Sequence, residues 1–298
     1  MATNTKIADG LTARLISQAK DYYVLTKPEV NLLILMTTSA GYYLGLRGRF
    51  HVAGMIHTLV GTLLVASGTA TLNQWMERSW DARMRRTANR PLPSGRIGPQ
   101  RALFFGLFLS IAGGLYLALL VNRLSSVLAI ATLLSYLLIY TPLKRRTWLC
   151  TLLGAFPGAM PTLIGWAGAA NAIDLHAMYL FAVLFLWQFP HFLAIALLYR
   201  DDYERAGYRM LPRFDLDTRF TRGEIVVFTL VLIGLTLLPG AGKSGILHTG
   251  TLLLAGGFLL FHSMRLASSG SRVLAGRLLH ASVVYLPVVL LIMASGKY

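Results

Sequence analysis

Three oxygen-bearing side chains recur every four residues near the end of an apolar segment: Asn73, Glu77 and Asp81. Residues four apart share one face of an α-helix, so a helix that continues through Asp81 would align them as a stripe. Carboxylates at membrane depth are costly and usually face a bundle interior or a watery cavity. Such oxygen ligands suit Mg²⁺, which commonly binds one or two carboxylates plus substrate phosphates. The alternative is an ordinary helix end, with Glu77 paired to a nearby arginine.

Basic side chains surround this stripe and could bind phosphate oxygens. Arginine offers forked donors that match phosphate geometry, and the candidates here are Arg78, Arg83, Arg85, Arg86 and Arg90. Later in the chain, Tyr140 precedes Lys144, Arg145 and Arg146. These cations could stabilise the charge of a departing diphosphate, or they could only set membrane topology.

A second acidic cluster follows another apolar segment. The stretch "YRDDYERAGYRMLP" (199–212) contains Asp201, Asp202 and Glu204 among arginines. Each carboxylate alone would be unremarkable. Two such clusters on one side of a membrane predict convergence on a single Mg²⁺–diphosphate group.

Three polar side chains lie inside otherwise apolar segments. His191 and Gln188 occur in "LFLWQFPHFLAIAL" (184–197), and Asn31 occurs near the start of the first apolar run. A histidine there is either a hydrogen-bonded core residue, an orienting donor or an axial ligand for haem iron. For Asn31 the simpler reading is a helix–helix hydrogen bond.

These groups must be positioned by membrane helices, because the chain is 55% hydrophobic and only 13% charged. A soluble protein normally carries about 25% charged residues. Apolar runs long enough to cross a bilayer recur throughout. We expect an all-α bundle of nine transmembrane helices, near 29–46, 53–76, 102–121, 125–141, 149–170, 177–198, 224–241, 247–264 and 278–295.

The net charge of +16 follows membrane topology and does not indicate nucleic-acid binding. Of the 28 Lys and Arg residues, all but five fall in alternate connections on one side. The exceptions are Arg47, Arg49, Arg123, Lys243 and Lys297. The positive-inside rule therefore predicts a cytoplasmic N-terminus and a C-terminus outside. We expect a cytoplasmic segment over 1–26 and one transmembrane domain over 27–298.

The single cysteine, Cys150, excludes an internal disulfide framework and a multi-cysteine metal site. The first 20 residues contain no apolar core typical of a signal peptide. We therefore expect a multi-pass protein of a bacterial inner membrane, with the lipid bilayer as its principal environment.

The stretch "NQWMERSWDARMRRTANRPLPSGR" (73–96) resembles the first aspartate-rich motif of the UbiA-type intramembrane prenyltransferases. That motif usually reads Asn-x3-Asp-x3-Asp, followed by Arg-Thr-x-x-Arg-Pro-Leu-Pro. Four further blocks resemble the branch of this family that farnesylates haem B: 27–45, 140–147, 187–212 and 285–292. The resemblance runs from about residue 20 to the C-terminus.

The resemblance implies a helix bundle around a lipid-open cavity, with polar caps on the cytoplasmic side. Farnesyl diphosphate would be bridged by Mg²⁺ to Asn73, Glu77, Asp81, Asp201 and Asp202. The diphosphate would also contact Arg78, Arg85, Arg86, Arg90, Lys144, Arg145 and Tyr140. An allylic cation would be attacked by a vinyl group of haem B, and water would complete haem O. His191, Gln188 and Asn31 become candidate haem contacts.

The sequence departs from the family pattern in two places. Glu77 stands where Asp is usual, which lengthens the ligand arm by a methylene. The second motif lacks a regular Asp-x3-Asp spacing, because Tyr199 and Tyr203 flank Asp201 and Asp202.

Two other functions stay open. The first is the same chemistry on another acceptor, either a quinone precursor or a chlorophyll-type ring. The second is a transporter or a haem-handling protein, although a transporter should place its polar residues near the bilayer midplane. A haem-modifying enzyme could also contact haem A synthase or the assembly of a terminal oxidase.

Overall fold

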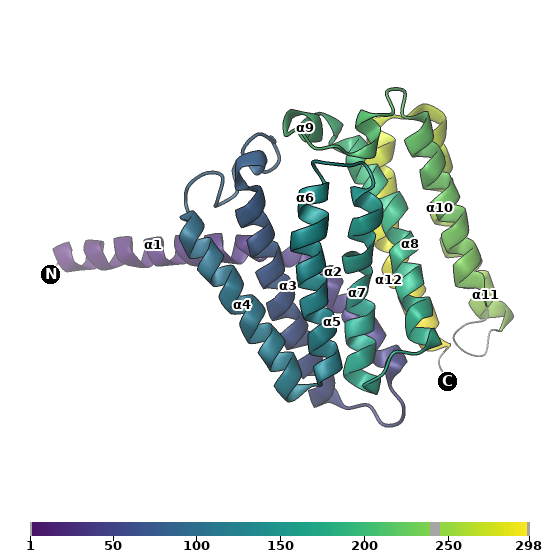
Figure 1. Ribbon diagram of the computed structural model, residues 1–298, viewed down its shortest axis with the longest axis horizontal. Helices are drawn as coiled ribbons and strands as arrows, with labels where there is room; N and C mark the ends of the chain where they lie inside the picture. Colours follow the sequence, from purple (N-terminus) through teal and green to yellow (C-terminus); the bar gives the residue numbers. More distant parts are fainter. Residues whose placement is uncertain (1, 239–244, 297–298) are drawn as a thin grey trace.

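The computed structural model describes residues 2–238 and 245–296, and every regular element within these ranges is a helix (Figure 1). The prediction of an all-α chain is confirmed. The helices are α1 (Ala2–Leu25), α2 (Pro28–Gly45), α3 (Val52–Asp81), α4 (Pro99–Leu120), α5 (Arg123–Leu134), the π-helix η1 (Ser135–Tyr140), α6 (Thr141–Leu143), α7 (Cys150–Ala170), α8 (Leu175–Leu198), α9 (Arg200–Arg205), the 3₁₀-helix η2 (Leu211–Arg213), α10 (Arg219–Leu237), α11 (Ile246–Ser269) and α12 (Arg272–Ser295).

Eight helical segments of the described chain are long and apolar enough to cross a membrane. They are α3, α4, the continuous segment Arg123–Leu143, α7, α8, α10, α11 and α12. The first expected span corresponds to α2, which is not among the eight because polar residues such as Glu29 and Asn31 lower its mean hydropathy. The structure therefore establishes a multi-pass membrane protein with eight candidate spans. The end of the span expected over 224–241 lies outside the described residues.

Helix α3 is the longest element, with 30 residues, and it extends five residues past the end expected from hydropathy. At 1.5 Å per residue it is about 45 Å long, which exceeds the roughly 30 Å hydrocarbon core. Its C-terminal turns can therefore carry Glu77 and Asp81 beyond the most apolar depth. The chain then enters the 82–98 loop, where Pro91 and Pro93 cannot donate helical hydrogen bonds.

Helices α2 and α7 cross at close range because each places a glycine against the backbone of the other. A Cβ on Gly41 would lie 2.2 Å from the carbonyl oxygen of Thr162. A Cβ on Gly165 would lie 2.0 Å from the carbonyl oxygen of Thr38. Small residues at such crossings let helix backbones approach in a membrane. This crossing fixes α2, and with it the residue that precedes α2, relative to the bundle.

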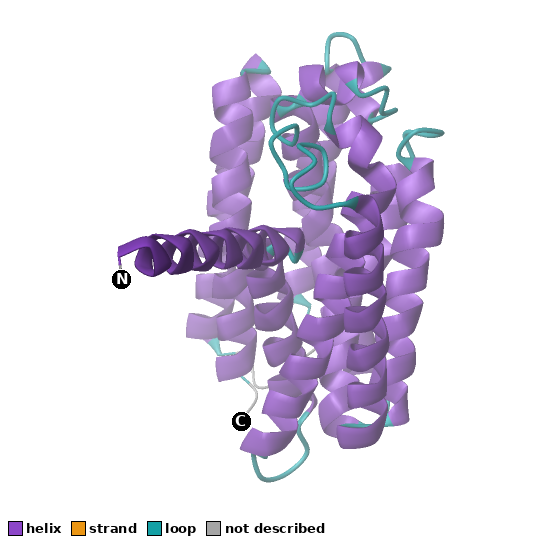
Figure 2. Ribbon diagram, turned by 90° about the vertical axis from the view of Figure 1, so that its left-hand side faces the viewer, coloured by secondary structure: helices purple, strands orange, loops and turns teal. Residues whose placement is uncertain are grey.

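Residues 1–26, expected as a cytoplasmic segment, contain helix α1. Figures 1 and 2 show α1 lying crosswise to the bundle and projecting away from it. Its C-terminal end is attached by an Asp21–Arg96 ion pair of 2.9 Å and by Tyr22 against Phe105. The carbonyl of Leu25 accepts a 2.7 Å hydrogen bond from Gln74 Nε2 on α3.

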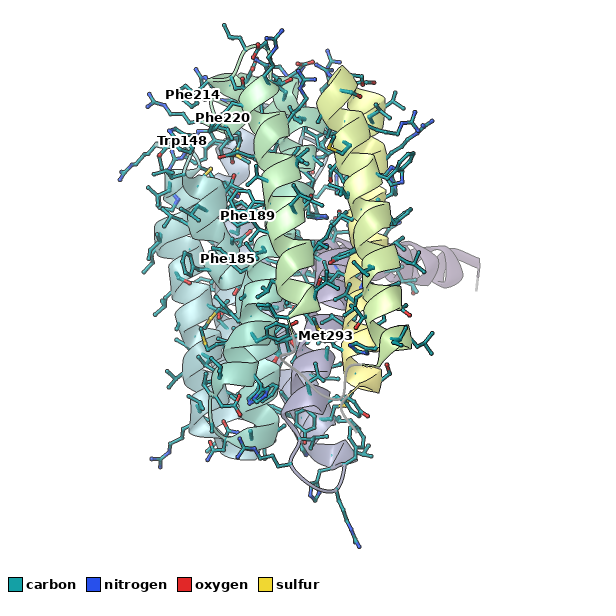
Figure 3. All side chains as sticks on the ribbon, turned by 90° about the vertical axis from the view of Figure 1, so that its right-hand side faces the viewer. Trp148, Phe185, Phe189, Phe214, Phe220 and Met293 are labelled. Carbon is teal, nitrogen blue, oxygen red and sulfur yellow. The ribbon has the colours of Figure 1, made fainter. Side chains whose placement is uncertain are left out.

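The basic connections 82–98, 144–149 and 199–218 gather at one end of the bundle (Figure 1). Trp148, Phe214 and Phe220 are exposed at the same end (Figure 3). Aromatic side chains are enriched at the level of lipid headgroups, so these three exposed aromatics support a membrane interface here. Among the five cations expected on the opposite side, Lys243 and Lys297 lie outside the described residues.

We predict that Gly165→Ala lowers the free energy of unfolding by about 1–3 kcal/mol, because the added methyl forces α2 and α7 apart. Gly257→Ala is the matched control, since a Cβ there meets nothing within 4 Å. The control should be neutral or slightly stabilising, as alanine is the better helix former. Thermal unfolding in detergent, followed by tryptophan fluorescence, measures both. Equal midpoints for the two variants would contradict the close crossing.

Candidate active site

The three oxygen-bearing residues of the first motif lie on one continuous helix. Asn73, Glu77 and Asp81 all belong to α3, and their exposed fractions are 1%, 7% and 3%. The helical spacing therefore forms the expected stripe, and the stripe is buried.

Each member of the stripe contacts a cationic side chain. Lys144 Nζ donates to both Glu77 oxygens, at 3.1 and 3.0 Å. Lys27 Nζ donates to Asn73 Oδ1 at 3.2 Å. Arg90 Nη1 lies 2.9 Å from Asp81 Oδ2. The site is therefore a cluster of alternating charges whose carboxylates are neutralised by the chain itself.

Asn73 is also held through its amide. Its Nδ2 donates to Glu77 Oε2 at 3.0 Å and to Thr141 Oγ1 at 3.1 Å. Thr141 follows η1, and its hydroxyl donates in turn to the Tyr136 carbonyl at 2.9 Å. Single-turn π-helices occur often at functional sites, because the wider turn redirects side chains. Here the turn brings Thr141 to Asn73 and leaves Tyr140 beneath Lys144, with Nζ 4.6 Å from the ring centre.

Lys27 is a site residue that motif spacing did not identify. It precedes α2 in a left-handed conformation, with φ at 52°. Burial, together with the repulsion of Arg90 and Lys144, lowers the pKa of Lys27 to about 7. Lys144 behaves oppositely. Burial disfavours its charge, but Glu77 and the neighbouring tyrosines, Tyr140 foremost, together outweigh burial and hold the pKa of Lys144 well above its usual value.

Tyr208 is a second site residue beyond the expected set. It is 2% exposed, and its ring centre lies 6.0 Å from Lys144 Nζ, the partner of Glu77. Burial and the negative charge of Glu77 raise the pKa of Tyr208. The only sequence signal was its place in the 199–212 block, where an aromatic among charged residues is not diagnostic.

Asp202 of the second acidic cluster supports the loop that follows α3. It accepts hydrogen bonds from the backbone N–H groups of Arg85 and Arg86, at 3.3 and 3.4 Å, and it pairs with Arg205. The contact therefore docks α9 onto the 82–98 loop.

Asp201 points elsewhere. Its side chain is 58% exposed, and Arg272 Nη2 lies 2.6 Å from its Oδ1. This hydrogen bond lowers the pKa of Asp201. Within the described residues, no three or more His, Cys, Asp and Glu side chains group as a metal site. In this structure the oxygens of Asp202 accept from the loop and those of Asp201 face Arg272, so the convergence of both acidic clusters on one metal stays a prediction.

Some of the predicted phosphate-binding cations contact the stripe and others contact different parts of the chain. Arg90 and Lys144 contact the stripe, whereas Arg145 lies 3.8 Å from the ring centre of Trp80. Arg78 Nη1 donates to the carbonyl of Trp75, and Arg85 contacts Asp202 through its backbone. Arg86 contacts two tyrosines of the second acidic cluster. Its guanidinium lies 4.8 Å from the ring centre of Tyr199, and its Nη2 lies 3.5 Å from the Tyr203 hydroxyl.

The three candidate haem contacts differ in how their polar atoms are used. Asn31 Nδ2 donates to the Thr26 carbonyl and to Ser67 Oγ, both at 2.8 Å, which joins α2 to α3. Gln188 Nε2 donates to the Ala155 carbonyl at 2.9 Å and to the carbonyl of Leu184 at 3.2 Å.

His191 forms a hydrogen bond between its Nδ1 and Ser282 Oγ at 2.8 Å. The amides of Asn31 and Gln188 thus serve helix–helix packing, while Nε2 of His191 has no hydrogen-bond partner among residues 2–238 and 245–296.

The oxygens of Asn73, Glu77 and Asp81 are of a suitable type to bind a magnesium ion, but the two carboxylates are already paired with cations. They are hard ligands of the type Mg²⁺ takes, and Mg²⁺ needs only one or two carboxylates when phosphates complete its shell. Each carboxylate already has a cationic partner, so a metal ion must share or displace Lys144 or Arg90.

Known proteins resemble this chain in sequence over nearly its full length. The profile of the UbiA prenyltransferase family matches residues 34–284. A protein of Solibacter usitatus (strain Ellin6076) named protoheme IX farnesyltransferase is 49% identical over 280 residues, covering 91% of this chain and 96% of that protein. A protein of Koribacter versatilis (strain Ellin345) with the same name is 42% identical over 288 residues, covering 93% of each chain.

Solved structures show the same fold at low sequence identity. One is described as digeranylgeranylglyceryl phosphate synthase, with a TM-score of 0.75 and 16% identity, covering 94% of this chain and 99% of that chain. Another is a UbiA homolog from Archaeoglobus fulgidus bound to GPP and Mg²⁺, with a TM-score of 0.63 and 12% identity, covering 92% of this chain and 99% of that chain.

We predict that Lys144→Met lowers the free energy of unfolding by about 3–5 kcal/mol, because it leaves the buried Glu77 carboxylate without its ion-pair partner. The double variant Glu77→Gln, Lys144→Met should recover much of that loss. Unfolding of Lys144→Met, of the single variant Glu77→Gln and of the double variant in detergent forms a double-mutant cycle with the wild type. Additive effects would show that the pair is energetically independent.

Proposed function

Because the chain belongs to the UbiA prenyltransferase family, we propose that it transfers a farnesyl group from farnesyl diphosphate to a vinyl group of haem B, giving haem O and diphosphate. The observation that carries this proposal is the 49% identity, across 91% of the chain, to a protein named protoheme IX farnesyltransferase. The buried oxygen stripe with its cations supplies the chemistry that such a transfer requires.

We further propose the membrane arrangement. Helix α2 would be the ninth span beside the eight long apolar helices. The basic end of the bundle would face the cytoplasm of a bacterial inner membrane, and the C-terminus would lie outside. Bacterial relatives and the clustering of basic connections at one end support this orientation.

The diphosphate would bind at the stripe on α3. A bound Mg²⁺ would neutralise the diphosphate as it departs, and Asn73, Glu77 and Asp81 are the residues that would hold it. Lys27, Lys144 and Arg90 would donate to phosphate oxygens. Lys144 and Arg90 are each paired with a carboxylate, whereas Lys27 contacts the neutral amide of Asn73, so the ammonium form of Lys27 would be available to an anionic substrate. Asp202 would act indirectly, by holding the loop that carries Arg90.

The reaction breaks the bond between the farnesyl carbon and the diphosphate oxygen, and the diphosphate leaves with the electron pair. The vinyl π-electrons of haem B then form the new carbon–carbon bond. Water adds to the cation left on the haem substituent and releases a proton, which yields a hydroxyethylfarnesyl group. Preorganised cations at the diphosphate stabilise the charge that develops as the first bond breaks. Exclusion of bulk water protects the farnesyl cation from hydrolysis.

The acceptor decides between this proposal and its nearest alternatives. Purified protein in detergent, given haem B, farnesyl diphosphate and Mg²⁺, should form a product with the mass of haem O. Chelation of Mg²⁺ should stop its formation, and added Mg²⁺ should restore it. If the protein prenylates a quinone precursor or a chlorophyll-type ring and does not prenylate haem B, the acceptor in the proposal is wrong. Contact with haem A synthase or with terminal oxidase assembly stays a prediction.

We predict that Asn73→Ala and Asp81→Asn each lower turnover on the order of 100-fold or more, since each removes a residue that would hold the Mg²⁺ that neutralises the departing diphosphate. Asp201→Asn is the matched control, because Asp201 is exposed and faces Arg272. It should retain turnover near the wild-type level. Initial rates of haem O formation measure all three. A loss in Asp201→Asn as large as in Asp81→Asn would restore Asp201 to the site.

A further inference from the structure

Ser282 on α12 receives two side chains from α8. His191 Nδ1 lies 2.8 Å from Ser282 Oγ, and Trp187 Nε1 donates to the Ser282 carbonyl at 2.8 Å. The exposed fractions are 0% for Ser282, 3% for Trp187 and 9% for His191. Ser282 therefore holds two buried side chains of α8, His191 through its hydroxyl and Trp187 through its carbonyl.

The proton positions in this network follow from a third contact. Ser282 Oγ lies 2.7 Å from the Leu279 carbonyl, which can only accept a hydrogen bond. The single hydroxyl proton of Ser282 is therefore donated to Leu279. Its oxygen can then only accept from His191, so the imidazole carries its proton on Nδ1. In the neutral ring, Nε2 consequently bears an open lone pair.

The orientation of this lone pair is also fixed. The His191 ring stacks on Trp187, with ring centres 4.6 Å apart and an interplanar angle of 23°. Phe192 approaches edge-on, with ring centres 5.3 Å apart. Within the part of the chain that the structure describes, His191 Nε2 forms no hydrogen bond. The ring cannot turn without losing both its stacking and its hydrogen bond.

We infer that Ser282 is a positioning residue that presents the Nε2 lone pair of His191 to the iron of the haem substrate. Metal-binding histidines commonly donate their other N–H to a fixed acceptor, which sets the tautomer and raises ligand basicity. Axial imidazole ligation is a standard mode of holding haem iron. This inference rests on the proposed function, since it takes haem B as the substrate.

Binding of haem B and of iron-free protoporphyrin IX, in detergent and without farnesyl diphosphate, tests the inference. Ser282→Ala should weaken haem B binding about 10- to 100-fold and shift the Soret band, whereas protoporphyrin IX should bind as to the wild type. Ser282→Thr keeps the hydroxyl and should restore both the affinity and the spectrum. His191→Ala should abolish the same spectral signature.

Ser263→Ala is the matched control, because Ser263 is equally buried and bonds the carbonyl of Leu259 at 3.0 Å, far along the chain from His191. Its haem spectrum should be that of the wild type. If Ser282→Ala does not fold, Ser282→Cys provides the test, since a thiol is a weak acceptor and should weaken haem binding but not porphyrin binding.

An unchanged haem affinity and spectrum in Ser282→Ala, or equal losses for haem B and protoporphyrin IX, would overturn the inference. Measuring haem O formation by the wild type distinguishes a failure of this inference from a failure of the proposed function. If the wild type makes haem O while these variants bind haem normally, only the role of Ser282 fails. If the wild type neither binds nor converts haem B, the proposed function fails with it.

Discussion

The buried ion pair between Glu77 and Lys144 joins the elements of the basic end. Lys144 Nζ contacts both oxygens of Glu77 on α3, while the Lys144 carbonyl accepts a 2.8 Å hydrogen bond from the Arg209 backbone. Tyr208, next to Arg209, is buried with its ring centre 6.0 Å from Lys144 Nζ. A carboxylate at this depth is costly without such partners. The contacts that stabilise this carboxylate therefore hold the 144–149 and 199–218 connections against the end of α3.

The same constraint shapes the chemistry. A cluster whose acids are already paired is stable in the protein, and it still contains more cations than carboxylates. An incoming diphosphate and Mg²⁺ would exchange partners within the cluster, so no isolated buried charge has to exist at any stage. The α2–α7 glycine crossing contributes by fixing the start of α2, which places Lys27 against Asn73. The cluster at the basic end and the His191–Ser282 network would then serve two different substrates.

Sequence patterns predicted the helices well and the contacts of the site only in part. The apolar runs found the eight long spans, and the four-residue spacing of Asn73, Glu77 and Asp81 became one buried stripe. Hydropathy ended this helix too early, because it records apolarity and not helix length. Lys27 and Tyr208 were missed, since neither their spacing nor their residue type distinguishes them from topology-setting or interfacial residues. Asp201 contacts Arg272 and Arg78 contacts the Trp75 carbonyl in this structure, and their roles at the site stay predictions.

The sequence by itself determined the all-helical fold, the basic end and the stripe on α3, because hydropathy and helical period are local properties. Only the tertiary structure decided which cation pairs with which acid. Arginines and lysines outnumber acids, and the decisive pair, Glu77 with Lys144, is separated by 67 residues. Neighbours on a helix also diverge by about 100°, so Asp202 turns inward to the loop while Asp201 faces Arg272. Such choices depend on how the helices pack, and no spacing in the chain encodes them.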